Sequence, residues 1–137
     1  MRECLIKSRK RVRDHGEVFT PSHIVKDMCD LIPDDAWTIE SKFLEPTCGT
    51  GNFLVEIYAR KLTLCKDVRQ GLKALASIYG IDIMQDNVDE SRNRLLTMLV
   101  DKFPNITYDA VMIASAILKN NIRCGDSLEI QKEWATT

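Results

Sequence analysis

Apolar residues recur along the chain with the two spacings that distinguish helices from strands. Five stretches place them three or four positions apart, which is the spacing of one helix face. These predicted helices cover residues of about 21–32, 52–64, 67–76, 86–103 and 108–118. Three shorter apolar runs resemble buried parallel strands; they end at Leu44, cover residues 77–83 and cover residues 121–128. The pattern predicts an α/β domain with a partial, doubly wound parallel sheet of about three strands and helices on both faces.

Residues 45–51, Glu-Pro-Thr-Cys-Gly-Thr-Gly, form a predicted turn between the first strand and a helix that begins near Asn52. Pro46 ends the strand because it cannot donate to a ladder, and Gly49 and Gly51 permit torsions that other residues avoid. Such a turn lets the backbone approach a ligand, and the helix N-terminus offers N–H groups to a carboxylate or phosphate. The pattern leaves open a binding loop or a plain connection, but it matches neither a P-loop nor a dinucleotide fingerprint.

Two acidic residues at strand ends are further candidates for ligand binding, and one segment before a helix is a candidate binding segment or helix start. Asp82 ends the second strand, where its two carboxylate oxygens could accept hydrogen bonds from both hydroxyls of a ribose; the alternative is a turn or cap residue. Asp126 follows Gly125 at the end of the third strand, where the alternative is a simple turn. Thr20 is a good N-cap and Pro21 suits the first helical position, so the pattern alone makes them a helix start.

Composition is that of an ordinary globular protein. The 137 residues are 45% hydrophobic and 28% charged with a net charge of -1, which predicts one domain. Any nucleic-acid contact must therefore come from a local patch. The candidate is the basic segment of residues 1–14, which contains Arg2, Lys7, Arg9, Lys10, Arg11 and Arg13. These cations either contact DNA phosphates or belong to a solvated helix face or a partly ordered tail.

Cysteine and histidine usage argues against a metal site. The five cysteines form no C-x-x-C pair and the chain has two histidines, so no zinc spacing is present. No secretory signal and no apolar run long enough for a bilayer occurs. We expect a reduced, cytoplasmic protein without a membrane partner.

Three segments resemble conserved motifs of one family, in the expected order. Residues 45–51 resemble the first motif of S-adenosylmethionine-dependent DNA adenine-N6 methyltransferases of the restriction–modification type. Residues 16–21, Gly-Glu-Val-Phe-Thr-Pro, are similar to the tenth motif of that family, and residues 125–126 are similar to the third. The resemblance implies a Rossmann-like methyltransferase fold over residues 15–137, incomplete at the C-terminus, with S-adenosylmethionine as the cofactor.

The resemblance also implies roles for individual residues. Phe19, Thr20 and Pro21 would surround the methionine part of the cofactor, and Asp82 would bind the ribose. Asp126 would receive the exocyclic amine of the adenine, because a carboxylate accepts the protons that an amine donates. The cofactor-binding residues that we predict are Phe19, Thr20, Pro21, Glu45, Pro46, Gly49, Gly51, Asn52, Phe53, Asp82, Ile83, Asp126, Ser127 and Leu128.

The segment that carries the chemistry in this family, Asn/Asp-Pro-Pro-Tyr/Phe, is not found, since no proline follows Pro104. No catalytic residue is therefore predicted. We expect the cofactor-binding part of a site-specific DNA adenine-N6 methyltransferase that is inactive alone, with DNA as the partner of the intact enzyme. An unfinished sheet predicts self-association or a partner polypeptide that completes it. The alternative is a non-catalytic, methyltransferase-like interaction or regulatory module.

Overall fold

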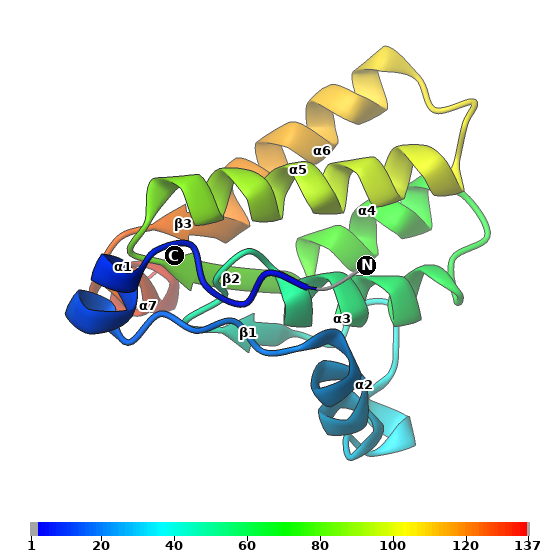
Figure 1. Ribbon diagram of the computed structural model, residues 1–137. Helices are drawn as coiled ribbons and strands as arrows, with labels where there is room; N and C mark the ends of the chain where they lie inside the picture. The colour runs from blue at the N-terminus through cyan, green and yellow to red at the C-terminus, as the bar shows by residue number, and fades with distance from the viewer. Residues whose placement is uncertain (1–2, 137) are drawn as a thin grey trace.

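A computed structural model describes residues 3–136, which fold into a three-stranded parallel sheet with helices packed on it (Figure 1). The strands are β1 (Phe43–Glu45), β2 (Ile78–Asp82) and β3 (Ile122–Cys124). The helices are α1 (Arg9–His15), α2 (Ser22–Asp30), α3 (Asn52–Leu62), α4 (Val68–Ala76), α5 (Gln85–Lys102), α6 (Tyr108–Asn121) and α7 (Ser127–Ala135), with a 3-10 turn at Asp34–Ala36. Among residues 3–136, no helix is both long and apolar enough to cross a membrane. The predicted α/β class is confirmed.

The strands lie in the order β1–β2–β3 and all run in the same direction. Leu44 is opposite Tyr79 in the first pair, and Ile81 is opposite Arg123 in the second. Helices α3 and α4 connect β1 to β2, and α5 and α6 connect β2 to β3. Because the strands are parallel, their carboxyl ends meet at one edge of the sheet, which is where open α/β sheets bind ligands.

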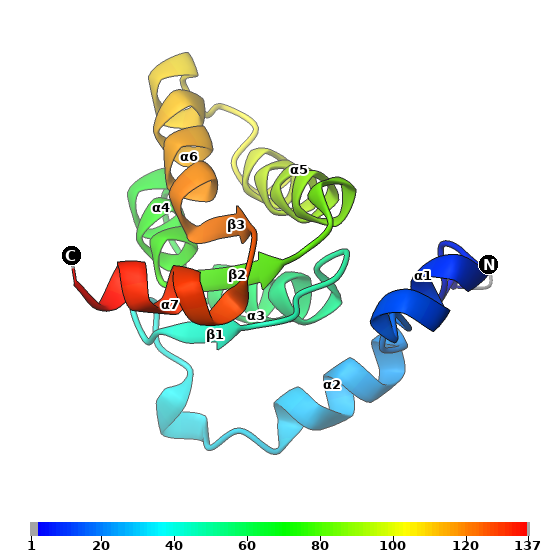
Figure 2. The same ribbon diagram turned by 90° about the vertical axis from the view of Figure 1, so that its left-hand side faces the viewer.

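Helices cover both faces of the sheet, as predicted. Side chains alternate along β2, and Gly80 faces α3, since a Cβ at this position would lie 2.8 Å from Leu54. Tyr79 faces the other way, and its ring meets Trp134 of α7 edge-on at 5.0 Å. Figure 2 shows α7 in front of the sheet and α3 behind it. The main core includes Leu54, Ile57, Tyr58, Leu75, Ile78, Val88, Leu95, Leu99, Leu118 and Ile122.

The third strand is shorter than predicted, and an unpredicted helix follows it. β3 ends at Cys124, whereas Ser127 and Leu128 belong to α7. Asp126 is the N-cap of this helix, because its Oδ1 atom accepts a hydrogen bond from the N–H of Glu129 at 3.0 Å. Asn121, which was also predicted to lie in the strand, is the last residue of α6. The Gly-Asp turn therefore ends one element and starts the next.

The start of α2 also differs from the prediction. Pro21, and not Thr20, is the N-cap, and it provides no side-chain cap. The carboxylate of Glu3 serves instead, since it accepts from the N–H of Ser22 at 2.8 Å and from its hydroxyl at 2.7 Å. Because Glu3 lies 19 residues before Ser22, a local sequence pattern could not predict this cap.

Leu44, at the end of a strand predicted to be buried, and Ile113 of α6 are both half-exposed. Leu44 is 44% exposed because β1 is an edge strand and α7 packs on β2. Ile113 of α6 is 53% exposed, while Ala114 and Leu118 form the buried side of that helix. Apolar spacing thus identified α6 but not the full orientation of its faces.

Lys61 is a buried lysine that fixes the start of the sheet. Its Nζ donates to the carbonyls of Thr38 at 2.9 Å and Ile39 at 3.1 Å, and to that of Ser41. It also donates to the hydroxyl of Ser77 at 2.9 Å, immediately before β2. Burial lowers the pKa of Lys61 to about 8. One side chain of α3 therefore joins the segment before β1 to the residue that precedes β2.

Candidate functional site

The turn after β1 needs both of its glycines. Gly49 and Gly51 have φ angles of 56° and 96°, in the region that favours glycine. A Cβ on Gly49 would lie 2.9 Å from the ring of Phe19, and one on Gly51 would lie 2.9 Å from Oγ of Ser91. The absence of side chains here lets the residue-19 segment and α5 approach the turn closely.

The start of α3 is open to a ligand. Gly51 is its N-cap, so no side chain accepts from the first N–H groups of the helix. The side chain of Asn52 instead donates to the carbonyl of Thr20 at 2.8 Å. Arg94 of α5 donates to Asn52 Oδ1 at 2.9 Å and to the carbonyl of Thr50 at 2.8 Å. These bonds fix the position of Thr20 relative to the turn.

Asp82 at the end of β2 accepts three hydrogen bonds within the protein. Its Oδ1 atom accepts from the N–H of Met84 at 2.9 Å and from Nδ2 of Asn87 at 3.1 Å. Its Oδ2 atom accepts from the N–H of Gly49 at 3.0 Å. A carboxylate has about four acceptor positions. One position, on Oδ2, therefore remains for a ligand in this arrangement.

Two adjoining pockets lie at the carboxyl edge of the sheet. Their volumes are about 170 Å³ and about 320 Å³, and both are lined by Val18, Phe19, Thr47 and Gly49. The smaller pocket adds the predicted residues Thr20, Glu45, Asn52 and Phe53, and the larger adds Pro46, Asp82, Ile83 and Ser127. Sequence elements that lie far apart along the chain thus meet at one site.

Four predicted residues do not line either pocket: Pro21, Gly51, Asp126 and Leu128. Gly51 is buried against Ser91 beneath the turn. Asp126 is exposed and caps α7, and it lies between Gly125 and Ser127, which both line the larger pocket.

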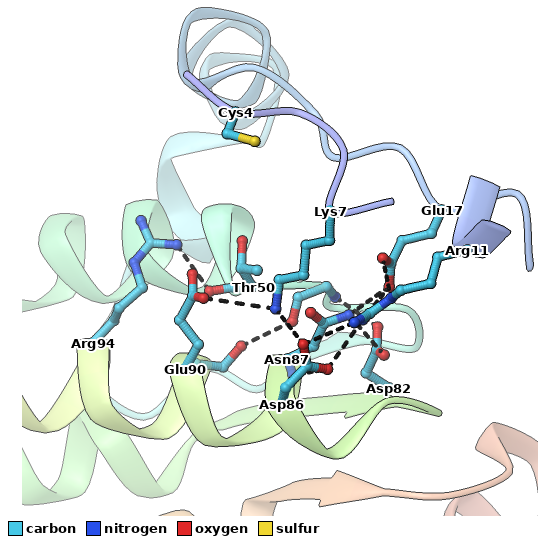
Figure 3. Close-up of polar contacts among 12 residues, drawn as sticks. Cys4, Lys7, Arg11, Glu17, Thr50, Asp82, Asp86, Asn87, Glu90 and Arg94 are labelled. Carbon is cyan, nitrogen blue, oxygen red and sulfur yellow. Dashed lines mark hydrogen bonds and ion pairs between the residues drawn. The ribbon is translucent and has the colours of Figure 1, made fainter. Parts of the chain in front are cut away.

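The basic N-terminal segment forms ion pairs with α5 at this edge (Figure 3). Lys7 and Arg11 each contact Asp86 at 2.8 Å, and Arg11 also pairs with Glu17. Hydrogen bonds from Arg11 and then Lys7 hold the pKa of Asp86 well below its usual range. Arg9, Lys10 and Arg13 remain exposed, as a solvated helix face would be. Neither interpretation of the basic segment, as a DNA contact or as a solvated face or tail, predicted these ion pairs within the protein.

Cys48 lies in the turn but is poorly suited to nucleophilic chemistry. It is buried, and this burial, followed by the charge of Asp82, raises the pKa of its thiol to about 12. A thiol is nucleophilic as the thiolate, which is scarce at neutral pH with such a pKa. No cluster of three or more potential metal ligands occurs in residues 3–136.

The sequence reasoning missed a polar stripe on α5. Asn87, Ser91 and Arg94 follow one another at spacings of four and three residues, so they share one face of the helix. Each of them donates a hydrogen bond toward the turn or the strand end: Asn87 to Asp82, Ser91 to the carbonyl of Gly49 at 3.1 Å, and Arg94 to Thr50. Their helical spacing was the signal that could have revealed them.

Residues 3–128 match the family model described as N-6 DNA Methylase. Over 93 residues the chain is 38% identical to the Type II methyltransferase M.VspI of Vibrio sp. (strain 343), a stretch that makes up 68% of this chain and 19% of that relative. The chain thus spans about a fifth of the length of that relative. No solved structure gives a significant match. Since the family model covers nearly all of the described residues, the chain belongs to the N-6 DNA methylase family.

Proposed function

We propose that the chain is the S-adenosylmethionine-binding part of a site-specific DNA adenine-N6 methyltransferase. The observation that carries the proposal is the pair of adjoining pockets at the carboxyl edge of the sheet, with the remaining acceptor position of Asp82 in the larger one. Gly49 brings the backbone of the turn against both pockets. This set of groups fits a ligand with a ribose and a charged amino-acid end.

The smaller pocket fits the amino-acid half of the cofactor. Asn52 and Phe53 line it at the uncapped start of α3, whose N–H groups favour a carboxylate. Glu45 lines the same pocket and carries the charge that an ammonium group requires. Phe19 and Thr20 close this side, and the bond from Asn52 to the Thr20 carbonyl fixes their position.

The larger pocket fits the nucleoside half. The remaining acceptor position of Asp82 would take a ribose hydroxyl, and Pro46 and Ile83 provide apolar surface for the adenine ring. Asp126 caps α7 through Oδ1, so we assign the exocyclic amine of adenine to its Oδ2 atom. When bound, S-adenosylmethionine would supply a methyl group on a positively charged sulfur.

DNA is the substrate that we propose for the complete methyltransferase. The sequence of residues 1–137 holds no Asn/Asp-Pro-Pro-Tyr/Phe segment, so we expect the chain alone to bind the cofactor without methylating adenine. We also propose that self-association or a partner polypeptide covers the β1 side of the sheet. A groove of about 480 Å³ lies there, lined by residues that include Phe43, Leu44, Tyr79 and Trp134.

The proposal is tested by calorimetric titration of the purified chain with S-adenosylmethionine, using paired cap variants. Asp126→Ala removes the N-cap of α7 and the acceptor that we assign to adenine. Asp67→Ala removes the N-cap of α4, where the Asp67 side chain accepts from Gln70 N–H. Both variants should lose about 0.5–2 kcal/mol of stability, and only Asp126→Ala should lose cofactor affinity.

Equal affinity in the two variants would remove Asp126 from the cofactor site. A folded wild-type chain that does not bind S-adenosylmethionine would overturn the proposal and favour a non-catalytic interaction or regulatory module. Circular dichroism and thermal unfolding of every sample provide the evidence of folding.

A further inference from the structure

Arg11 joins two carboxylates that come from distant parts of the chain (Figure 3). Its Nε lies 2.7 Å from Glu17 Oε1, and its Nη2 donates to Glu17 Oε2 at 2.9 Å. Its other contacts are bidentate with Asp86, at 2.8 Å from Nη1 and 3.0 Å from Nη2. The side chains of Arg11 and Glu17 are only 17% and 10% exposed. This planar, two-sided contact is one that lysine cannot reproduce.

Asn87 extends this contact to Asp82. The Asn87 side chain is fully buried at the start of α5, and its Nδ2 donates to Glu17 Oε2 at 2.7 Å and to Asp82 Oδ1 at 3.1 Å. Rotating the amide by half a turn would place its oxygen against two carboxylates. The orientation of Asn87 is therefore fixed by Glu17 on one side and by Asp82 on the other.

Arg11 is the cation that offsets the charge of the carboxylates clustered around Asn87. Glu17, Asp82 and Asp86 bring three carboxylates together around Asn87 and Arg11. Lys7 also pairs with Asp86, but it makes no described contact with Glu17 or Asp82. Without Arg11, Glu17 would be a buried carboxylate without a cationic partner, which is strongly unfavourable. Its rearrangement would release Asn87, which holds Asp82 Oδ1.

We propose that Arg11, Glu17 and Asn87 are positioning residues that hold the Asp82 carboxylate so that Oδ2 faces the ribose of the cofactor. This inference rests on the proposed function, since it assigns a purpose to the Asp82 site. Arg11 and Asn87 line neither pocket, whereas Glu17 lines the larger one; the role that we assign to Glu17 is to hold Asn87. Asn87 and the N–H of Met84 occupy Oδ1, and Arg11 and Glu17 act through Asn87. Oδ2, bonded to the Gly49 N–H, is then the oxygen available to the ligand.

The test compares two probes on the full chain: S-adenosylhomocysteine and an analogue that lacks both ribose hydroxyls. Arg11→Met should bind S-adenosylhomocysteine about tenfold more weakly, whereas its affinity for the analogue should be unchanged. Lys10→Met is the matched control, because Lys10 is also a cation of α1 but is 77% exposed and pairs with Asp14. Lys10→Met should bind both probes like the wild type.

A second variant separates positioning from folding. Arg11→Met combined with Glu17→Met leaves neither a buried lone charge nor the contact that fixes Asn87, and pairs replaced in this way are often tolerated. It should fold and still show the selective loss for S-adenosylhomocysteine. Added to Asp82→Ala, the same pair of substitutions should cause no further loss.

Several outcomes would overturn the inference. An equal loss for both probes would mean that Arg11 only supports the fold, and undiminished affinity in both Arg11 variants would mean that Asp82 is held without it. A wild-type chain that prefers S-adenosylhomocysteine no more than the analogue would remove the ribose contact itself. Wild-type protein that binds neither probe would refute the proposed function, whereas wild-type binding with unaffected variants would refute the positioning role alone.

Discussion

Asp82 uses one carboxylate oxygen to hold the end of β2 and retains part of the other for a ligand. We expect Asp82→Ala to weaken S-adenosylmethionine binding by about 1.5–3 kcal/mol, the range for hydrogen bonds to a charged group. Calorimetry measures the change, with Asp89→Ala, at an exposed position of α5, as the control. Unchanged affinity in a folded Asp82→Ala protein would contradict the ribose role.

Lys61 is the residue whose replacement should affect the fold most directly. Lys61→Met would remove a donor from the carbonyls of Thr38, Ile39 and Ser41, and the Ser41 carbonyl has no other described donor, so we expect a cost of about 1–3 kcal/mol. Met preserves much of the apolar stem, so the loss reports on the hydrogen bonds. Urea unfolding at neutral pH measures it, and a variant as stable as the wild type would contradict the importance of these bonds.

The same lysine predicts a pH dependence. Its pKa is about 8 in the folded protein, below the ordinary value of 10.5, so the unfolded chain binds more protons between these values. The contribution of Lys61 to the free energy of unfolding should therefore rise as the pH increases from about 8 to about 10.5. Urea unfolding of wild type and Lys61→Met at about pH 7.5 and about pH 9.5 measures the difference. A pH-independent difference would contradict the shifted pKa.

Residues whose chemistry is evident from their neighbours in sequence could be predicted. The glycine turn at 45–51 and the acidic residue at the end of β2 are of this kind, because strand, turn and helix follow one another directly. Glu17 and Asn87 could not be found in that way, since their contact spans 70 residues. Glu3, which caps α2, was missed for the same reason.

At the scale of elements, the turn between β1 and α3 depends on close packing against α5. Gly51→Ala would add backbone strain and a contact with Ser91, so we expect a loss of about 2–4 kcal/mol. Gly16→Ala is the control, because Gly16 also has a positive φ but has no neighbour within 4 Å of the added Cβ. It should lose only about 1–2 kcal/mol. If thermal or urea unfolding gave equal losses of stability for the two variants, backbone strain and not the contact with Ser91 would account for the effect of Gly51→Ala.

The helices were more predictable than the short strands. α3, α4 and α5 repeat their apolar spacing over several turns, and their predicted bounds lie within two residues of the observed ones. β3 has three residues, which are too few to show the alternation of apolar and polar side chains that identifies a strand. The N-cap of α7 follows two residues after the strand ends. Burial of β1 was misjudged because exposure depends on which helix crosses the neighbouring strand.

For the whole molecule, the uncovered side of β1 predicts association. Leu44→Asp should weaken any dimer or partner complex that covers the groove beside β1, because it places a charge where apolar surface would be buried. Affinity for S-adenosylmethionine should not change, since Leu44 lines neither pocket at the carboxyl edge of the sheet. Light scattering at micromolar concentration measures the mass, and a monomeric wild-type chain would count against self-association.

The ion pairs of the N-terminal segment also constrain the order of folding. Lys7 and Arg11 meet Asp86 across 79 and 75 residues, and contacts of such long sequence separation form slowly because a large loop must close first. During synthesis, the first residues of the chain must wait for the beginning of α5 before these contacts can form. The same segment continues into residues 15–19, which line the larger pocket. We therefore expect this pocket to close late in folding, so that binding of a ligand there would report that the chain has folded from its first helix to its fifth.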